Sequence, residues 1–233
     1  MIESLIELNH LRIILAIGML GYASFTDVTK REISDYVWIV FGAIAAILLI
    51  FEPNLSESLI TIGISLIVAP VAIIIWRIGL FGGADAFAII VLAALVPQIS
   101  FTDQMITPFT ILTNAVLISI SPLFINFFRN LIEMARRHDI FEGFEEPTRK
   151  RIMAMFLGYR AQNPKFGFSI EKNVGKHKKL NLVLHHAENA EFCHTPNTWI
   201  TPGVPYMLFI TGGLIIQLMY GDAIFRFLES VLK

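Results

Sequence analysis

The sequence predicts an all-α polytopic membrane protein with six transmembrane helices and a small mixed α/β cytoplasmic domain inserted before the last helix. Three observations predict this fold. Apolar residues make up 55% of the 233 residues and charged residues only 16%, whereas a soluble domain carries about 25% charged residues. Apolar runs long enough to cross a bilayer recur along the chain. Most of the charge is concentrated in one segment, residues 129–200.

The composition also excludes several classes of protein. The mean hydropathy of +0.65 excludes a disordered chain, and the net charge of −1 excludes a basic nucleic-acid-binding protein. A single cysteine, Cys193, permits neither an internal disulfide nor a cysteine zinc cluster. The first residues include Glu3 and Glu7 and not the basic segment of a cleavable signal, so the first apolar run is expected to stay in the mature protein.

The candidate spans follow from the lengths of the apolar runs. A helix needs roughly 20 residues to cross the hydrocarbon core, and soluble core helices are an alternative for any one run but not for the whole set. The second and fourth runs are short, which suggests surroundings covered by protein or a locally thinned bilayer. The expected spans are Leu8–Thr26, Tyr36–Phe51, Leu59–Ile78, Ala84–Ile99, Ile106–Phe128 and Val204–Tyr220.

Basic residues set the expected orientation, because short cytoplasmic loops are enriched in Lys and Arg. All the basic connections between spans fall on one side, while the loops around Glu52–Glu57 and Asp103 contain neither residue type. We therefore expect a plasma-membrane protein with its N-terminus outside and residues 129–200 in the cytoplasm. The basic residues concerned are Lys30, Arg31, Arg77, Arg129, Arg136 and Arg137.

Residues 129–200 differ from the rest of the chain. They contain 12 Lys+Arg and 8 Asp+Glu, a balance of +4, whereas the other 161 residues contain 6 and 11, a balance of −5. Alternating stretches at Phe166–Ile170 and Leu180–Leu184 predict short strands, and Ile132–Phe144 predicts a helix. The expected domains are therefore residues 1–128 with five spans, the cytoplasmic domain at 129–200, and residues 201–233 with the last span and a C-terminal tail.

Two carboxylates fall at the ends of predicted spans, where ionisable residues are costly and are read as functional by default. Asp27 closes the first span and Asp85 opens the fourth. Since the first span runs inward and the fourth begins on the inner side, both are expected near the cytoplasmic face. Taken singly, Asp27 also fits a charge cluster with Lys30 and Arg31, and Asp85 fits an acid that satisfies free amides at a helix N-terminus.

Together the two residues fit the chemistry of an aspartyl protease. Two close carboxyls cannot both ionise, so one can deprotonate a water molecule while the other, protonated, polarises the scissile carbonyl. The pair Gly82-Gly83 beside Asp85 lets backbone approach the catalytic centre or an extended substrate. This chemistry requires no metal and no other cofactor. It makes Asp27 and Asp85 the candidate catalytic residues and Gly82 and Gly83 candidate substrate-binding residues.

These residues resemble a known family. Gly82-Gly83-Ala84-Asp85 resembles the GxGD motif of intramembrane-type aspartyl proteases, which include presenilins, type IV prepilin peptidases and archaeal preflagellin peptidases. The segment Asp27–Asp35 resembles the first-aspartate segment of the peptidase branch. The predicted spans and the domain before the last span resemble the archaeal preflagellin peptidases most. The likeness in residues covers Phe25–Trp38 and Phe81–Phe87, and it implies that the catalytic aspartates are Asp27 and Asp85.

The sequence departs from the pattern of the family at three positions. Ala84 stands at the second glycine of the motif, Ser34 stands where proline is common, and Phe87 stands where bacterial relatives usually have lysine. The chain also lacks the paired-cysteine segment and the second catalytic domain of bacterial prepilin peptidases. These differences argue against their N-methylation activity.

The resemblance further implies the substrate: preflagellins or pilin-like preproteins with a short basic leader, cleaved at the cytoplasmic face just before a hydrophobic helix. Glu32 and Asp35 lie close to Asp27 in sequence and are candidates for attracting the basic residues of the leader. The alternative is that they are solvated loop charges opposite Lys30 and Arg31. The other partner expected is the lipid bilayer.

Two other classes of function remain open from the sequence. A small ion- or proton-coupled transporter would use the acidic pair as a cation site, and a membrane scaffold would use residues 129–200 to bind a cytoplasmic partner. Three weaker features favour structural interpretations. Thr201–Pro205 is similar to the proline-containing element that other GxGD proteases place near their aspartate pair, but the motif itself is not present, and the start of the last span is the favoured interpretation. His185-His186 with Cys193-His194 offers possible metal ligands but lacks zinc spacing. Asp103 and Asp222 fall on the outer side, away from the pair.

Overall fold

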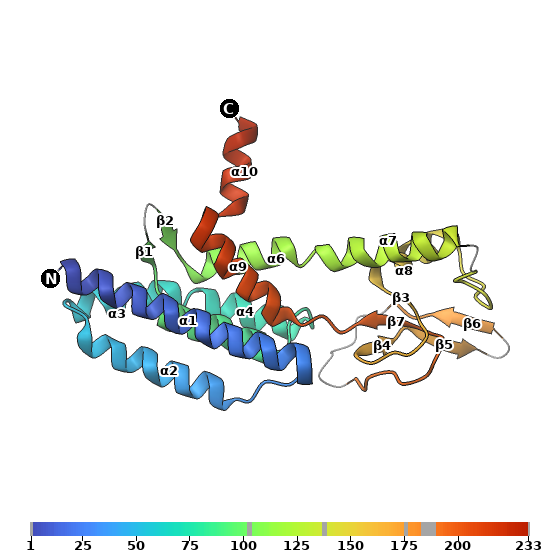
Figure 1. Ribbon diagram of the computed structural model, residues 1–233, viewed down its shortest axis with the longest axis horizontal. Coiled ribbons are helices and arrows are strands. Elements are labelled where there is room, and N and C mark those ends of the chain that lie inside the picture. Colours follow the sequence, from blue (N-terminus) through green and yellow to red (C-terminus); the bar gives the residue numbers. More distant parts are fainter. Residues whose placement is uncertain (1, 102–103, 137–138, 175–176, 183–189, 233) are drawn as a thin grey trace. The chain divides into compact units, whose positions relative to one another are not determined.

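The computed structural model describes residues 2–101, 104–136, 139–174, 177–182 and 190–232 (Figure 1). Four residues named in the predictions from sequence lie outside these ranges: Asp103, Arg137, His185 and His186. The chain forms two compact units, Met1–Ser119 with Pro205–Lys233 and Ile120–Val204. The structure is mostly helical with a small sheet region, which agrees with the predicted fold class at this level.

Helices occupy all six of the predicted apolar segments (Figure 1). Those of the first unit pack around one apolar core, and a short hairpin, β1–β2, joins two of them. The elements of this unit are α1 (Ile2–Lys30), α2 (Tyr36–Leu48), the 3₁₀ helix η1 (Leu49–Phe51), α3 (Leu55–Ser65), α4 (Val68–Arg77), α5 (Gly83–Leu95), β1 (Ile99–Phe101), β2 (Gln104–Ile106), α6 (Pro108–Ile118), α9 (Tyr206–Tyr220) and α10 (Ala223–Leu232).

Three helical stretches of the described chain are long and apolar enough to cross a membrane: Ile6–Lys30, Leu55–Arg77 and Pro108–Ala135. The apolar helices at Tyr36–Phe51, Gly83–Leu95 and Tyr206–Tyr220 are shorter. Each of the two later long stretches is divided by a brief break, between α3 and α4 and between α6 and α7 (Ser121–Ala135). Pro70 and Pro122 lie in the first turn after these breaks, where a missing N–H is tolerated.

The expected end of the fourth span is wrong. The sequence extends that span to Ile99, but α5 ends at Leu95, before Pro97, and Ile99 begins β1. The fourth predicted span ends at Ile99, and the fifth begins at Ile106. These two residues pair with each other in the antiparallel β1–β2 hairpin, so both are strand residues. Proline cannot donate the backbone hydrogen bond that would continue the helix, and this explains the early end.

Helix α5 is the centre of the first unit. It contacts α1, α2, α3, α4, α6 and α9, and its buried residues include Ala88, Ile89 and Leu92. Helices α9 and α6 of the same unit pack closely on each other. A Cβ atom added at Gly213 of α9 would lie 2.4 Å from the carbonyl oxygen of Ile111 and 2.9 Å from the nitrogen of Ala115. Only glycine therefore permits this approach of the two helices.

Arg12 is a fully buried cation of the first unit, and the sequence analysis did not identify it. Its Nη1 donates to the carbonyl oxygens of Leu95 at 2.8 Å and Ala94 at 3.4 Å, the last carbonyls of α5. Its Nη2 lies 2.8 Å from Oε1 of Glu52. The guanidinium thus satisfies carbonyls that have no partner within α5 and compensates the negative end of the helix dipole.

The second unit combines two helices with short strands. Strand order in its three-stranded sheet is β3-β7-β4, with both pairings antiparallel, and β5 and β6 form a separate hairpin. Its elements are α7 (Ser121–Ala135), α8 (Thr148–Leu157), β3 (Tyr159–Ala161), β4 (Gly167–Ser169), β5 (Glu171–Val174), β6 (His177–Leu180) and β7 (Thr198–Pro202). The unit begins at Ile120, whereas the sequence analysis places the domain boundary at Arg129.

Three local predictions in this unit have different outcomes. The strand predicted at Phe166–Ile170 is confirmed by β4. The strand predicted at Leu180–Leu184 meets only the last residue of β6, and its final two residues lie outside the described residues. The helix predicted at Ile132–Phe144 is wrong for the described residues after Ala135: Arg136 and residues 140–143 form turns, and Gly143 has φ 83°, a conformation that favours glycine.

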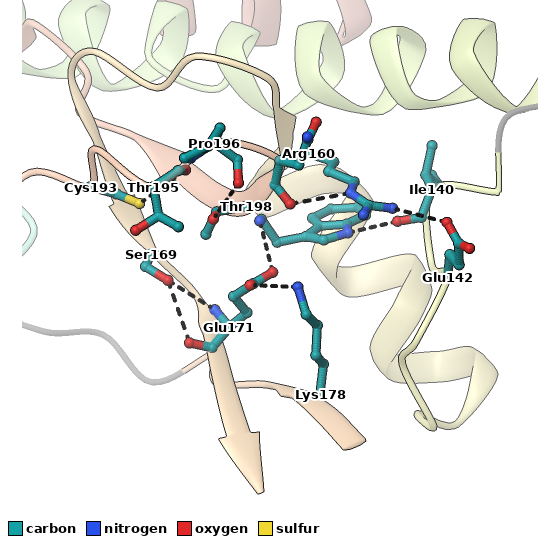
Figure 2. A network of polar contacts seen from close by, with 12 residues as sticks. Ile140, Glu142, Arg160, Ser169, Glu171, Lys178, Cys193, Thr195, Pro196 and Thr198 are labelled. Atoms are coloured by element: carbon teal, nitrogen blue, oxygen red, sulfur yellow. Dashed lines mark hydrogen bonds and ion pairs between the residues drawn. The ribbon is translucent and has the colours of Figure 1, made fainter. Parts of the chain in front are cut away.

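Trp199, in the central strand β7, is the fully buried centre of the second unit. Its ring stacks on Phe141 with centroids 4.9 Å apart, and its Nε1 donates to the carbonyl oxygen of Ile140 at 2.8 Å. Its backbone N–H donates to Glu171, which also binds Lys178 at 3.0 Å (Figure 2). Strand β7 was missed in the sequence, although Thr198-Trp199-Ile200-Thr201 is rich in strand-favouring residues.

Glu146 joins helix α8 to strand β6. Its Oε1 accepts hydrogen bonds from Nζ of Lys150 at 2.8 Å and from the N–H of Leu180 at 2.7 Å, and its side chain is 6% exposed. Burial alone would raise the pKa of this carboxyl. The two hydrogen bonds and the charges of Lys150 and Lys179 outweigh burial, so the pKa of Glu146 lies below its usual value of 4.5.

We predict that Arg12→Met destabilises the first unit by roughly 3–5 kcal/mol, because it leaves Glu52 and the end of α5 without their buried cation. The measurement is the thermal unfolding midpoint of the full chain in detergent. Arg12→Met/Glu52→Gln, which removes both charges, should recover part of the loss. Glu7→Gln, an exposed acid on the same helix, is the control, and an Arg12→Met midpoint equal to that of this control would contradict the prediction.

The Glu146 contacts predict a pH dependence for the second unit. A carboxyl with a lowered pKa stabilises the fold at pH above 4.5, and that stabilisation is lost as the pH falls through the folded-state pKa. Glu146→Gln should therefore lower the free energy of unfolding by about 1–2 kcal/mol at pH 7 and flatten its decline in acid. Urea titrations that follow Trp199 emission in a Trp38→Phe/Trp76→Phe background measure both effects. Equal acid sensitivity with and without Glu146 would refute them, and Glu191→Gln serves as the exposed control.

Candidate active site

Asp27 lies in the last turn of α1, where its carboxylate reaches the beginning of another helix. Its Oδ2 accepts a hydrogen bond from the backbone N–H of Met207 at 3.2 Å. Met207 belongs to the first turn of α9, and the residue that precedes this helix, Pro205, provides no side-chain cap. Asp27 therefore supplies an acceptor for a free amide of α9, at the end of the helix where its dipole favours a negative charge.

Asp85 lies in the first turn of α5 and is buried, with 7% of its surface exposed. Its Oδ2 accepts the backbone N–H of Gly82 at 2.9 Å. The side chain thus folds back over the turn that leads into its own helix. Gly82 has extended backbone with φ −76°, and a Cβ atom at this residue would lie 3.4 Å from Oδ2 of Asp85.

The first unit places these two carboxylates at the ends of helices that pack on one another. Helices α1, α5 and α9 are in mutual contact, and Asp27 lies in the last turn of α1 and Asp85 in the first turn of α5. Each carboxylate is also held by a backbone amide at the N-terminus of a helix. Two acids from segments far apart in the sequence therefore share one neighbourhood, bounded by the ends of α1, α5 and α9.

An aromatic pair lies beside the carboxylates. Phe81, which directly precedes the two glycines, is buried, and its ring centroid lies 4.5 Å from that of Tyr206. Tyr206 is the first residue of α9 and also packs on Phe209. Tyr206 and Met207 were not predicted from the sequence. The signal for them was the proline-containing element at 201–205, for which the sequence favoured the start of the last span over a place beside the aspartate pair.

Arg31 closes α1 in an unusual conformation. Its backbone N–H donates to the carbonyl oxygen of Asp27 at 3.0 Å, and its φ of 58° is in the left-handed region that ends many helices. The charge of its side chain interacts with that of Asp27. A cation is thus placed beside the first carboxylate, in addition to the amide of Met207.

The candidate substrate-binding acids occupy the connection that follows. Glu32 and Asp35 are exposed, between the end of α1 and the start of α2. Asp35 directly precedes α2, but its side chain makes no capping hydrogen bond there. Its carboxylate therefore does not cap the N-terminus of α2. Gly82 precedes α5 and Gly83 begins it, so both candidate glycines lie at the turn that Asp85 covers.

The remaining candidates lie away from this neighbourhood. Asp222 accepts the N–H of Ile224 at the break between α9 and α10, at the opposite end of α9 from Met207. Among the residues that the structure describes, no group of three or more His, Cys, Asp or Glu side chains is arranged to hold a metal ion. Cys193 is a free thiol whose backbone N–H donates to Gly167 within the second unit.

Comparisons with known proteins find peptidases. The type IV leader peptidase family matches residues 14–125, and the family described as archaeal peptidase A24 C-terminus type II matches residues 133–223. A preflagellin peptidase of Methanocaldococcus jannaschii is 28% identical, with 93% of this chain and 96% of that protein covered. Preflagellin peptidases of Methanococcus maripaludis and Methanococcus voltae are each 27% identical, covering 91% and 90% of this chain and 96% and 95% of theirs. The match to the type IV leader peptidase family includes both Asp27 and Asp85.

Proposed function

We propose that this signal peptidase, which is similar to the type IV leader peptidase family over residues 14–125, removes the short basic leader of preflagellins or pilin-like preproteins at the cytoplasmic face of the membrane. Asp27 and Asp85 form its catalytic pair. The observation that carries this proposal is the arrangement around the first turn of α9. Asp27 of α1 accepts the amide of Met207 in that turn, and Phe81, beside the Gly82 turn that Asp85 covers, packs on Tyr206. The similarity to peptidases over most of the chain favours this function over a transporter.

The proposed topology has six spans, with the N-terminus outside and residues 129–200 in the cytoplasm. Three stretches support it by length and apolar composition, and three shorter apolar helices support it by position. Exposed apolar side chains such as Ile14, Ile60 and Phe124 suit a lipid surface. On this topology, Asp27 and Asp85 lie close to the cytoplasmic interface, where water and the cleavage site of the substrate can reach them.

The proposed reaction uses one ionised and one protonated carboxyl. The ionised aspartate takes a proton from a water molecule as the water oxygen bonds to the scissile carbonyl carbon, while the protonated aspartate donates to the carbonyl oxygen. Collapse of the tetrahedral intermediate breaks the C–N bond, and the leaving nitrogen takes a proton from the pair. The N–H groups of Met207 and Gly82 hold the two carboxylates in place, since each donates to one Oδ2.

The proposed substrate places its two parts in different surroundings. The hydrophobic helix of the preprotein lies against the apolar helices of the first unit, and its basic leader lies on the cytoplasmic side. Glu32 and Asp35, exposed beside the end of α1, attract Lys or Arg of the leader close to the cleavage site. Asp35 makes no capping hydrogen bond to α2, so its carboxylate is not held by that helix.

We predict that Asp27→Asn and Asp85→Asn each reduce cleavage of a leader-bearing preprotein by at least about 10³-fold, because neither a base nor an acid alone completes the reaction. Asparagine preserves the size of each side chain and an acceptor for the amides of Met207 and Gly82. Both variants should therefore insert into membranes and unfold at midpoints close to that of the wild type. The measurement is in vitro cleavage with membranes that contain equal amounts of each protein.

The matched control is Asp222→Asn, the same substitution at an acid that caps α10, and it should cleave normally. Substantial cleavage by either Asp27→Asn or Asp85→Asn would rule out the pair. Uptake that depends on an ion gradient, without cleavage of any preprotein, would instead support the transporter.

We predict a smaller and different effect for the exposed acids. Glu32→Gln/Asp35→Asn should raise the KM for a basic-leader preprotein roughly threefold to tenfold and leave kcat nearly unchanged, because exposed ion pairs are worth about 0.2–1 kcal/mol each. The effect should weaken at high salt, which screens such pairs. Steady-state cleavage at two ionic strengths measures it, and a KM that does not respond to the substitutions assigns both residues to the solvated loop.

A further inference from the structure

A pair of hydroxyl groups links α1 to α9 one turn away from Asp27, and the proposed reaction does not use it. The hydroxyl oxygens of Ser24 in α1 and Thr211 in α9 lie 2.7 Å apart. Oγ1 of Thr211 also lies 2.9 Å from the carbonyl oxygen of Met207 and 3.4 Å from that of Leu20. Ser24 is buried, and a hydroxyl without a partner in such surroundings is costly. The contact therefore stabilises the packing of the two helices.

The chemistry of the hydroxyl groups gives these hydrogen bonds a direction. A hydroxyl has one proton to donate and two lone pairs with which to accept. The shorter of the two carbonyl contacts of Thr211, with Met207, is the better acceptor for its proton, which leaves Ser24 as the donor to Thr211. Met207 in turn donates its backbone N–H to Oδ2 of Asp27 at 3.2 Å. The contacts therefore form a ring that starts and ends on α1.

The spacing along each helix explains why this ring can close. Ser24 and Asp27 are three residues apart on α1, and Met207 and Thr211 are four residues apart on α9. Each pair thus lies within about one turn of its helix. The ring holds α9 on α1 at two points, one at the hydroxyl pair and one at the carboxylate (Figure 1). Two points fix both the sliding and the rotation of one helix on another, whereas one point does not.

The first turn of α9 also touches the segment that holds Asp85. The ring of Tyr206 lies 4.5 Å from that of Phe81, measured between centroids. Phe81 directly precedes Gly82, whose N–H donates to Oδ2 of Asp85 at 2.9 Å. The position of α9 therefore bears on the surroundings of both aspartates, on the first through the amide of Met207 and on the second through Phe81.

We propose that Ser24 and Thr211 are positioning residues for Asp27, because their hydroxyl pair sets the register of α9 on α1 and so keeps the Met207 amide on the carboxylate. The inference rests on the proposed function, in which Asp27 is one of the two catalytic residues. The hydroxyl pair acts through Met207 and not on the substrate. Its role is mechanical, since the N–H and the carbonyl of Met207 belong to different peptide groups and no proton passes along the ring.

The first experiment observes the amide of Met207 without requiring cleavage. Full-length protein with isotope-labelled methionine is studied by NMR in detergent micelles, and Met207→Leu assigns the resonance. Asp27→Asn removes the charged acceptor and so defines the chemical shift of the amide proton without it. Thr211→Val, which replaces the hydroxyl with a methyl group of similar size, should move the Met207 proton toward that position. Thr211→Ser, which keeps a hydroxyl, should leave it near the wild-type position.

The second experiment measures steady-state cleavage of a leader-bearing preprotein. Thr211→Val should lower kcat roughly tenfold or more, because a small displacement of a catalytic group is costly, and should leave KM nearly unchanged. Thr211→Ser should restore kcat. Ser24→Ala removes the other hydroxyl and should lower kcat in the same way. It also takes the place of Thr211→Val in both experiments if that variant does not fold.

The matched control removes a contact at the other end of α9. Gln217 is buried, accepts a hydrogen bond from Asn114 of α6 at 3.2 Å and donates to the carbonyl oxygen of Met105 at 3.0 Å. Gln217→Met should lower the thermal unfolding midpoint, because it breaks contacts between α9 and its neighbours, and should leave both kcat and the Met207 resonance unchanged. A role in stability alone would make Thr211→Val and Gln217→Met behave alike.

The two proposals fail in different ways. An unchanged Met207 resonance in Thr211→Val, or an equal loss of kcat in Thr211→Val and Gln217→Met, would overturn the positioning role. If the wild-type protein cleaves no preprotein, the proposed function fails, while the NMR experiment still decides whether the hydroxyl pair keeps Met207 on Asp27. If cleavage is normal and Thr211→Val changes neither kcat nor the resonance, only the positioning role fails.

Discussion

A charged side chain buried among apolar helices needs a polar partner, and in the first unit those partners are the ends of helices. Arg12 of α1 binds the last carbonyls of α5, Asp85 binds the amide that precedes α5, and Asp27 of α1 binds an amide in the first turn of α9. Helix ends carry unpaired backbone groups and a partial charge of the appropriate sign. This constraint determines which helices meet and where along their lengths they do so.

The contact of Arg12 with Leu95 also fixes the position of α1 along α5. The two helices run in opposite directions, so a register set at the C-terminal end of α5 sets which part of α1 faces its N-terminal end. Asp27 lies about 22 Å from Arg12 along α1, and Asp85 lies about 15 Å from Leu95 along α5. These lengths differ by only about 7 Å, so the two carboxylates lie toward the same end of the first unit. A buried cation distant from the carboxylates thus helps to set where Asp27 lies along α5, and α9 adds to the site from the other end of the sequence.

The positions of the apolar helices and the two key carboxylates were predictable from the sequence, because hydropathy and the cost of a charge at a span end are local signals. The parity of the spans predicts Asp27 and Asp85 on one side of the membrane, and in the structure they occupy the end of α1 and the start of α5. Arg12 was missed because a single arginine within an apolar run gives no indication of its partner, and the partner carbonyls belong to the backbone. The role of Met207 was not predicted for a related reason, since an amide at the start of a helix has no side-chain signature, and the proline-containing element at 201–205 indicated only where the helix begins.

The central claim is that Asp27 and Asp85 act as one pair, and the binding of a transition-state analogue tests it most directly. A hydroxyethylene peptide that copies the leader and the cleavage site replaces the scissile amide with a hydroxyl that both carboxyls contact. Such analogues bind at least about 10²-fold more tightly than substrates. The account predicts tight binding to the wild-type protein and a similar loss of that advantage in Asp27→Asn and in Asp85→Asn, measured by titration of the purified full chain. Full affinity for the analogue in either single variant would contradict it.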